Sequence, residues 1–416
     1  MDRFDLTESQ RAAVPLTQEQ ARALAALGEK LASRTSWWGE AEETEPGSVI
    51  DVTRDPDGNW WVLVRDAVGV ISVDGIELIV SPKIPQDHFL YLASQSGIIP
   101  RIEAQHTEIA SKPSLWEVLA HWFIHAAETL LRGELTKGYR ERSDELDRPR
   151  GRILALETAR VFYEGRPIVA CEFEEFSEDM ALNRIVRAAC DLVAASFALP
   201  RELRHRARSA LVRMPDVGVL RDADFRATVD RLTHRYSDAI AFAKVLLRGG
   251  GTKIAHGGAH GWCFLIRTPE LVEGGIRAVL QRALGPGHQI EKRGRALSGT
   301  RFTLNPDLVF DGNLAVGDVK YKYFEPEWRR SDLYQSVAFA AGYECKNAAV
   351  IGFEDRSSAR PPAVRVGKIL VEAFAWNVDM SCDPGESEEG LTAEIAAFIA
   401  RAQLDTSNNR LGMSGE

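Results

Sequence analysis

The 416-residue sequence lacks several features that mark whole classes of protein. Its five cysteines are scattered and never form a CxxC pair, which favours reduced thiols over a disulfide framework or a zinc site. No apolar run approaches the roughly 20 residues that a membrane span requires. The start, MDRFDLTESQ, is polar and acidic and resembles no signal peptide. We therefore expect a cytoplasmic protein without a membrane partner.

The sequence also lacks an excess of positive charge and a phosphate-binding loop. The net charge of -9 argues against a protein that coats nucleic acid through bulk charge, although a local basic cleft is compatible with it. The spacing GxxxxGK[ST] is absent, so the segment RGGGTK is not expected to bind a nucleotide. His256 and His260 are four residues apart, but without a partner Cys or His nearby a solvated loop is favoured over a zinc site.

The patterns that are present indicate a multidomain α/β protein. Helical spacing of Ala and Leu predicts a helix over residues 17–34. Four β-type runs follow, SVIDVT, NWWVLVR, VGVISVDG and IELIVSPKI, with turn signals between them. We expect a β-rich N-terminal domain over residues 1–113, with a small antiparallel sheet or barrel. Trp60 and Trp61 should lie on opposite faces of their strand, one in the core and one exposed for a partner.

The rest of the chain is predicted to form a helical domain and then a mixed sheet. Apolar residues three and four apart indicate helices through residues 114–250. The segment RGGGTKIAHGGAHG, residues 248–261, is interpreted as a linker. Over residues 251–380 the elements follow the order αββαβ, which is typical of a mixed sheet flanked by helices. Residues 381–416 should hold one more helix and a polar, disordered end.

Two carboxylates and a lysine in LNPDLVFDGNLAVGDVKYK, residues 304–322, have a spacing suited to catalysis. Alternate side chains of a strand share a face, so Asp318 and Lys320 should project together. The turn signal FDGN predicts a hairpin that brings Asp307 close to Asp318. Crowded carboxylates repel each other and are relieved by a cation, and hard oxygen ligands favour Mg²⁺ or Mn²⁺. The alternative interpretation is a salt-bridged Asp and Lys on the face of a hairpin.

Neighbouring residues favour the catalytic interpretation. NPD, ten residues and DVK together form the pattern PD followed by DxK. Glu270 and Glu273 share one face of an upstream helix, so either can supply a third carboxylate. Downstream, DLYQSVAFAAGY places Gln335 at the start of a helix, where it can hydrogen-bond a nucleotide or a metal-bound water.

These residues resemble a PD-(D/E)xK nuclease core, and the chain as a whole resembles the McrC family, the nuclease subunits of McrBC restriction systems specific for modified cytosine. The resemblance runs through roughly residues 45–375. It includes IELIVSPKIP, RPRGRI, CEFEEFSEDMALNRIVRAA, ELVE and DLYQSVAFAAGY in the family's order. Each motif alone is weak, whereas their order is fairly specific.

The resemblance implies a role for each matching residue. It makes Asp307, Asp318 and Glu273 ligands of Mg²⁺ or Mn²⁺, Lys320 the catalytic lysine, and Gln335 an auxiliary residue. The family usually has LFE where this chain has LVE, so the choice between Glu270 and Glu273 stays open.

The resemblance also implies a function. It predicts a DNA endonuclease that is activated by a McrB-like AAA+ GTPase hexamer, with a β-rich N-terminal part that inserts into the partner's ring and stimulates GTP hydrolysis. GTP is then handled only through the partner, and double-stranded DNA is the substrate. The alternatives are a non-cutting adaptor of a ring NTPase and a standalone nuclease of the DNA-repair type.

Phosphate contacts require Arg and Lys, and two segments near the predicted site supply them. KRGRALSGTR carries Lys292, Arg293, Arg295 and Arg301, and KYKYFEPEWRR adds Lys322. Either segment can flank a DNA groove or be a solvated loop. A third basic run, RELRHRARSALVR, lies in the predicted helical domain.

Overall fold

A computed structural model describes residues 2–32, 48–97, 114–256, 259–300 and 302–412. Contacts divide the chain into two compact units, one of residues 1–109 and 252–416 and the other of residues 110–251. The boundaries of the four domains that the sequence predicts remain predictions. Within the described ranges, no helix combines the length and the apolar character that crossing a membrane requires.

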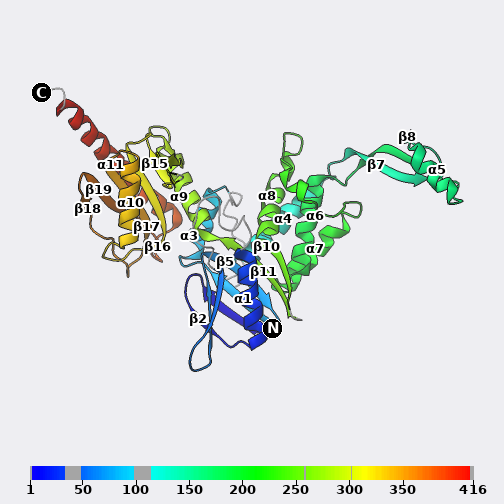
Figure 1. Cartoon of the computed structure of the whole chain (residues 1–416), viewed down its shortest axis with the longest axis horizontal. Helices are drawn as coiled ribbons and strands as arrows, with labels where there is room; N and C mark the ends of the chain where they lie inside the picture. Colours follow the sequence, from blue (N-terminus) through cyan, green and yellow to red (C-terminus); the bar gives the residue numbers. More distant parts are fainter. Residues whose placement is uncertain (1, 33–47, 98–113, 257–258, 301, 413–416) are drawn as a thin grey trace. The chain divides into compact units, whose positions relative to one another are not determined.

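The N-terminal part of the first unit consists of two sheets around one helix (Figure 1). The larger sheet has the order β1 (Asp2–Thr7), β6 (Ile76–Ser81), β5 (Ala67–Val73), β11 (Ala259–Arg267) and β10 (Gly250–His256). The smaller has the order β2 (Ala12–Val14), β4 (Trp60–Val64) and β3 (Ile50–Arg54). Helix α1 (Gln18–Ala32) contributes buried Ala and Leu side chains to the same core as these strands. The predicted helix and the four predicted strands are therefore confirmed.

Two predictions for this part need correction. Residues 250–256 and 259–261, interpreted as a linker, belong to strands β10 and β11. Glycine lowers strand propensity but keeps the backbone N–H and C=O groups that a ladder needs, and β11 is paired along its length with β5. Trp60 and Trp61 are both half-buried, so neither is fully exposed. Trp60 packs against the core, and the indole N–H of Trp61 donates to Asp55.

The C-terminal part of the first unit is a six-stranded mixed sheet with helices. Its strand order is β12 (Ile290–Glu291), β15 (Leu308–Phe310), β16 (Ala315–Tyr323), β17 (Asn347–Glu354), β19 (Ile369–Asn377) and β18 (Val364–Val366). A short separate hairpin pairs β13 (Arg295–Ala296) with β14 (Thr303–Leu304). Strands β16, β17 and β19 run parallel, and β15 and β16 form an antiparallel hairpin. The predicted αββαβ order, and the mixed α/β architecture of the whole chain, are confirmed.

Helices cover both faces of this sheet (Figure 1). Helix α10 (Arg330–Gly342) packs on the face that carries Val316 and Val350. Helix α11 (Pro384–Gly412) lies on the other face, where Phe398 is 6.1 Å from Phe310 and 5.2 Å from Phe374 between ring centroids. Helix α9 (Thr268–Leu284) contacts β16 and also α3 (Gln86–Gln95) of the N-terminal part. The predicted C-terminal helix is confirmed, but it continues through residues 405–412, which the sequence assigned to a disordered polar end. Residues 413–416 lie outside the described ranges.

The second unit combines a helical core with a small β arm. Its core helices are α4 (Leu115–Leu131), α6 (Ala181–Ala195), α7 (Arg201–Val212) and α8 (Ser237–Gly249). The arm consists of β7 (Gly138–Leu146), β9 (Val169–Ser177), β8 (Arg152–Ile153) and α5 (Ala155–Tyr163). The sequence predicted this region as mainly helical, so the three-stranded sheet of the arm is a correction.

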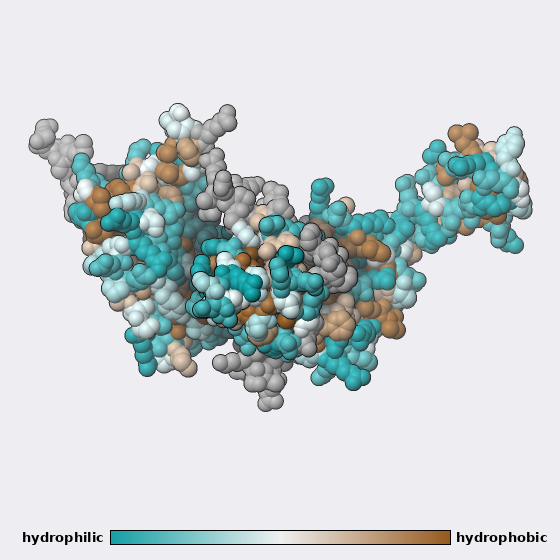
Figure 2. All heavy atoms as spheres, turned by 60° about the horizontal axis from the view of Figure 1, so that its bottom comes forward, coloured by the Kyte–Doolittle hydropathy of each residue, from teal (hydrophilic) through white to brown (hydrophobic). Residues whose placement is uncertain are grey.

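Apolar side chains are unusually exposed on this arm. Tyr163 and Leu156 of α5 are 95% and 84% exposed, and Tyr139 of β7 stacks at 5.1 Å on Phe176 of β9 while both remain exposed. Figure 2 shows brown apolar side chains at the surface of this arm, which is the part that Figure 1 labels β8 and α5. The sheet of the arm is too small to cover these residues because it has no second layer apart from α5.

Candidate functional site

The β15–β16 hairpin brings two carboxylates together at its open end. Its four-residue connection, residues 311–314, reverses the chain with Asp311 and Gly312 in left-handed conformations, with φ values of 47° and 78°. Leu308 pairs with Gly317, so Asp307 and Asp318 flank that pair. The backbone N–H of Val319 donates to Asp307 Oδ2 at 2.9 Å. The predicted approach of the two aspartates is therefore present in the structure.

Both aspartates are almost inaccessible to solvent, at 6% exposed for Asp307 and 4% for Asp318. Burial raises the pKa of Asp318 to about 6; the positive charge of Lys320 opposes this shift and the negative charge of Asp307 adds to it. A nearby cation stabilises the ionised form of such a carboxylate and lowers its pKa again.

Helix α9 supplies the third carboxylate, and the structure distinguishes between the two candidates. Glu273 lies beside Asp307, and its pKa is raised to about 8, first by burial and then by the charge of Asp307, against the opposing effect of Lys292. Glu270 is exposed and pairs with Arg267 at 3.4 Å, one helical turn away from the cluster. Of the two, only Glu273 lies against Asp307.

Lysine side chains lie against these acids. Lys320 Nζ is 2.5 Å from Asp318 Oδ2 and donates to Gln335 Oε1 at 2.7 Å. Gln335 is exposed on α10, so the predicted helix residue does reach the strand that carries the lysine. Lys292 Nζ lies 3.3 Å from Asp307 Oδ1 and 3.5 Å from Glu273 Oε2. The sequence interpreted Lys292 only as a surface contact for DNA, and its place among the acids was missed.

The chemistry of the donor set fits a hard divalent cation. Glu273, Asp307 and Asp318 offer only carboxylate oxygens, which Mg²⁺ and Mn²⁺ prefer. Asp318 Oδ2 is buried and is paired with the ammonium group of Lys320. In the described part of the chain, no three His, Cys, Asp or Glu side chains are placed so that they could hold a metal ion as they stand. The ammonium groups of Lys292 and Lys320 lie next to the acids. A metal ion would have to draw the three carboxylates closer together than they are here.

The predicted DNA contacts flank this cluster, but most of them are paired. Arg293 lies 3.1 Å from Glu291, and Arg295 lies 2.9 Å from Glu344. Lys322 pairs with Asp332 of α10. Arg301 lies outside the described residues. Surface ion pairs contribute little stability, so a DNA phosphate can replace the carboxylate partner of Arg293 or Arg295 at small cost.

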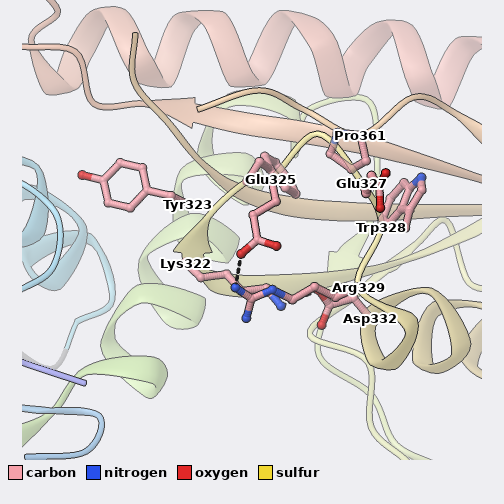
Figure 3. A pocket seen from close by; sticks show the side chains of 9 residues that line it. Lys322, Tyr323, Glu325, Glu327, Trp328, Arg329, Asp332 and Pro361 are labelled. Atoms are coloured by element: carbon pink, nitrogen blue, oxygen red, sulfur yellow. Dashed lines mark hydrogen bonds and ion pairs between the residues drawn. The ribbon is translucent and has the colours of Figure 1, made fainter. Parts of the chain in front are cut away.

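Lys322 and Asp332 also line a small cavity beside the site. Figure 3 shows this cavity with Tyr323, Trp328 and Arg329 around it, and an ion pair joins Arg329 to Glu325. Its volume is only about 10 Å³, which is space for about one water molecule. The cavity is therefore too small for a nucleotide.

The polar residues of the motif CEFEEFSEDMALNR have a structural role in the second unit. Arg184 donates to Asp224 at 2.8 and 2.7 Å and to Asp179 at 3.0 Å, and all three side chains are buried. Asn183 accepts from Tyr236 at 2.7 Å and donates to the backbone of Thr136. These bonds tie α6 to the loops around it, so the motif stabilises the helical core and is not part of the acidic site.

Comparisons with known proteins agree with the sequence patterns. The model of the family described as the McrBC 5-methylcytosine restriction system component matches residues 62–351. A chain in the refined half-complex from the tetradecameric assembly of Thermococcus gammatolerans McrB AAA+ hexamers with bound McrC has the same fold, with a TM-score of 0.68 and 17% identity over 95% of this chain and 99% of that one.

A second structure, the cryo-EM structure of the Thermococcus gammatolerans McrBC complex, matches at a TM-score of 0.45 and 20% identity over 68% of this chain and 88% of that one. No curated protein matches the chain.

Proposed function

The chain belongs to the McrBC 5-methylcytosine restriction system component family, and we propose that it is the Mg²⁺-dependent DNA endonuclease subunit of such a system. The observation that carries this proposal is the approach of Glu273, Asp307 and Asp318 to one another at the open end of the β15–β16 hairpin, with Lys320 ion-paired to Asp318. The mixed sheet beneath them, with helices on both faces, is compatible with the PD-(D/E)xK nuclease core that we propose. The sequence spacing of PD and DxK supports the same assignment.

Each side chain has a definite task in this proposal. Glu273, Asp307 and Asp318 would hold Mg²⁺, which when bound polarises the phosphoryl oxygen and makes a bound water easier to deprotonate. Lys320, fixed between Asp318 and Gln335, presents its ammonium group to the negative charge that develops on the phosphate. Hydrolysis then joins the water oxygen to phosphorus, breaks the P–O bond of the backbone, and leaves a proton on the departing oxygen.

The partner in this proposal is a McrB-like AAA+ GTPase hexamer. The related structure contains McrB AAA+ hexamers with bound McrC. The sequence here has no GxxxxGK[ST] spacing, so GTP would be hydrolysed by the partner and this chain would stimulate that reaction. Recognition of 5-methylcytosine would also belong to the partner.

Substitution of Asp318 tests the nuclease assignment. In the assembled complex on methylated duplex DNA, Asp318→Asn should reduce cleavage by at least about a hundredfold, because the neutral amide is a poorer metal ligand. Stimulated GTP hydrolysis by the partner should stay at the wild-type level. Glu270→Gln is the matched control, since it removes an acid from the same surface without touching the cluster. Cleavage at the wild-type rate by Asp318→Asn would refute the assignment.

The same assay separates the two alternative functions. Stimulation of GTP hydrolysis without any cleavage by the wild-type complex would identify a non-cutting adaptor. Mg²⁺-dependent cleavage by the purified chain without a partner would identify a standalone nuclease.

A further inference from the structure

Lys292 is placed where a metal ion would also have to bind. Its Nζ atom lies 3.3 Å from Asp307 Oδ1 and 3.5 Å from Glu273 Oε2, so one ammonium group bridges two carboxylates from separate elements. Both acids are shielded from solvent, with 9% and 22% of their side chains exposed. The Lys292 side chain is 46% exposed, so it reaches the acids from outside.

Two acids this close repel each other, and a cation between them relieves the repulsion. An ammonium group and a divalent metal ion cannot both occupy this place, because their positive charges repel at such a distance. We propose that Lys292 is a tethered counter-ion that holds Glu273 and Asp307 in the metal-free protein and must leave when a divalent cation binds. This inference rests on the proposed function, since it assigns a positioning residue to the same site.

The other lysine of the site does not share this role. Lys320 is ion-paired with Asp318 and held by Gln335, and it approaches neither Glu273 nor Asp307 in the ion pairs of the site. Lys320 therefore does not bridge the two acids that Lys292 joins. Lys320 pairs with Asp318, whereas Lys292 pairs with Glu273 of α9 and with Asp307 before β15. Only Lys292 therefore competes with a metal ion for Glu273 and Asp307.

The exposed side chain of Lys292 has room to turn toward solvent, although the backbone around it is held. Lys292 directly follows β12, where Ile290 pairs with Phe310, and it precedes the short strand β13. The next residue, Arg293, accepts a hydrogen bond from Tyr343 through its backbone oxygen. A DNA phosphate offers Lys292 a partner outside the cluster. DNA binding should therefore remove the competitor of the metal ion, and by linkage the metal ion should strengthen DNA binding.

Binding of Mn²⁺ to the full chain, without the partner, tests this role by isothermal titration calorimetry or electron paramagnetic resonance. Lys292→Met should bind Mn²⁺ about tenfold more tightly than the wild type, because a competing charge has gone. Arg295→Met removes one positive charge from the same segment but pairs with Glu344, so it should leave the affinity unchanged. Lys292→Gln is the second variant and should behave like Lys292→Met.

A short duplex with phosphorothioate linkages, which resists cleavage, extends the test. Adding this duplex should raise the Mn²⁺ affinity of the wild type by about the same factor by which Lys292→Met raises it without DNA. The Mn²⁺ affinity of Lys292→Met itself should change much less. Lys292→Met that binds Mn²⁺ like Arg295→Met, or more weakly than the wild type, would overturn the role of Lys292.

Failure of the proposed function gives a different result. If Asp318→Asn and the wild type bind Mn²⁺ equally, or neither binds it, the metal site itself is wrong. If Asp318→Asn loses Mn²⁺ and Lys292→Met matches the wild type, the nuclease assignment stands and only the counter-ion role fails.

Discussion

Glu273 should destabilise the metal-free protein, and its replacement should stabilise the fold while it abolishes cleavage. Its pKa of about 8, against an ordinary value of 4.5, arises from burial and from the charge of Asp307. That difference corresponds to roughly 5 kcal/mol at a pH above 8. Because the charges of Asp307 and Lys292 act on Glu273 in opposite directions, only part of this cost belongs to Glu273 alone. We expect Glu273→Gln to raise the free energy of unfolding at pH 8 by about 1–3 kcal/mol.

The direction of the pH dependence follows from the raised pKa. Below pH 4.5 both the folded and the unfolded chain carry a protonated Glu273, so its favourable contribution is fully present. Between pH 4.5 and about 8 the unfolded chain releases this proton first, and stability is lost as the pH rises. Asp318, with a pKa raised from 3.8 to about 6, acts in the same direction over a lower range. The metal-free wild type should therefore lose stability from pH 5.5 to pH 8, and Glu273→Gln should lose less.

Urea unfolding in EDTA at pH 5.5 and at pH 8 measures the difference in free energy of unfolding between the wild type and Glu273→Gln. Hydrogen exchange of β16 and α9 then shows whether the difference lies at the site. Glu270→Gln is the matched control: it lies one turn earlier on the same helix, is exposed, and should change stability at neither pH. Saturating Mg²⁺ should reverse the order of the two proteins, because only the wild type keeps the full ligand set. Glu273→Gln that is no more stable than the wild type at pH 8 would refute the electrostatic argument.

Two further predictions concern the scaffold. Asp224→Asn should destabilise the second unit by about 3 kcal/mol, because it breaks the two buried hydrogen bonds from Arg184. Asp222→Asn, at an exposed position, should have little effect. Urea unfolding with hydrogen exchange of α6 compares the two variants, and equal stability would contradict the buried network. Gly69→Ala should lower the free energy of unfolding by about 3 kcal/mol or more, since Gly69 has φ of 145° and a Cβ there would lie 1.9 Å from a backbone oxygen of β11. Gly75→Ala, with φ of 85° and no atom within 4 Å of the added Cβ, carries the backbone strain without the clash. Thermal unfolding that ranks the two variants equally would refute the role of the clash.

Local patterns were sufficient to predict the elements that carry the site. The four-residue connection that begins with Asp311 and Gly312 is short enough to fix the hairpin register, and both residues have the positive φ that its reversal of direction uses. Strand alternation then places Asp318 and Lys320 on one face, as the structure has them. Both arguments use residues close in sequence, so tertiary packing had little opportunity to alter them.

Long-range packing determined what the sequence could not predict. Glu270 and Glu273 are equivalent by helical spacing, and only the packing of α9 on β16 turns Glu273 to Asp307. Lys292 looked like any surface lysine because its two acidic partners lie 15 and 19 residues away. The arm was missed because β7, GYRERSDEL, has almost no apolar alternation and its partner β9 follows only after α5.

The N-terminal segment shows most clearly how distant residues position the site. Glu8, at the end of β1, is fully buried and accepts from Thr268 at 2.6 Å, the residue that begins α9. It also accepts from the backbone N–H of Lys83, whose ammonium group lies 4.4 Å from the ring of Tyr321, the neighbour of Lys320 in β16. Both elements that carry acids of the site are thus anchored to the same buried carboxylate region. This explains why contacts join residues 1–109 to residues 252–416 across the intervening helical unit. The same buried contacts therefore hold α9 and β16 in place, and these elements carry Glu273 and Asp318 of the proposed reaction.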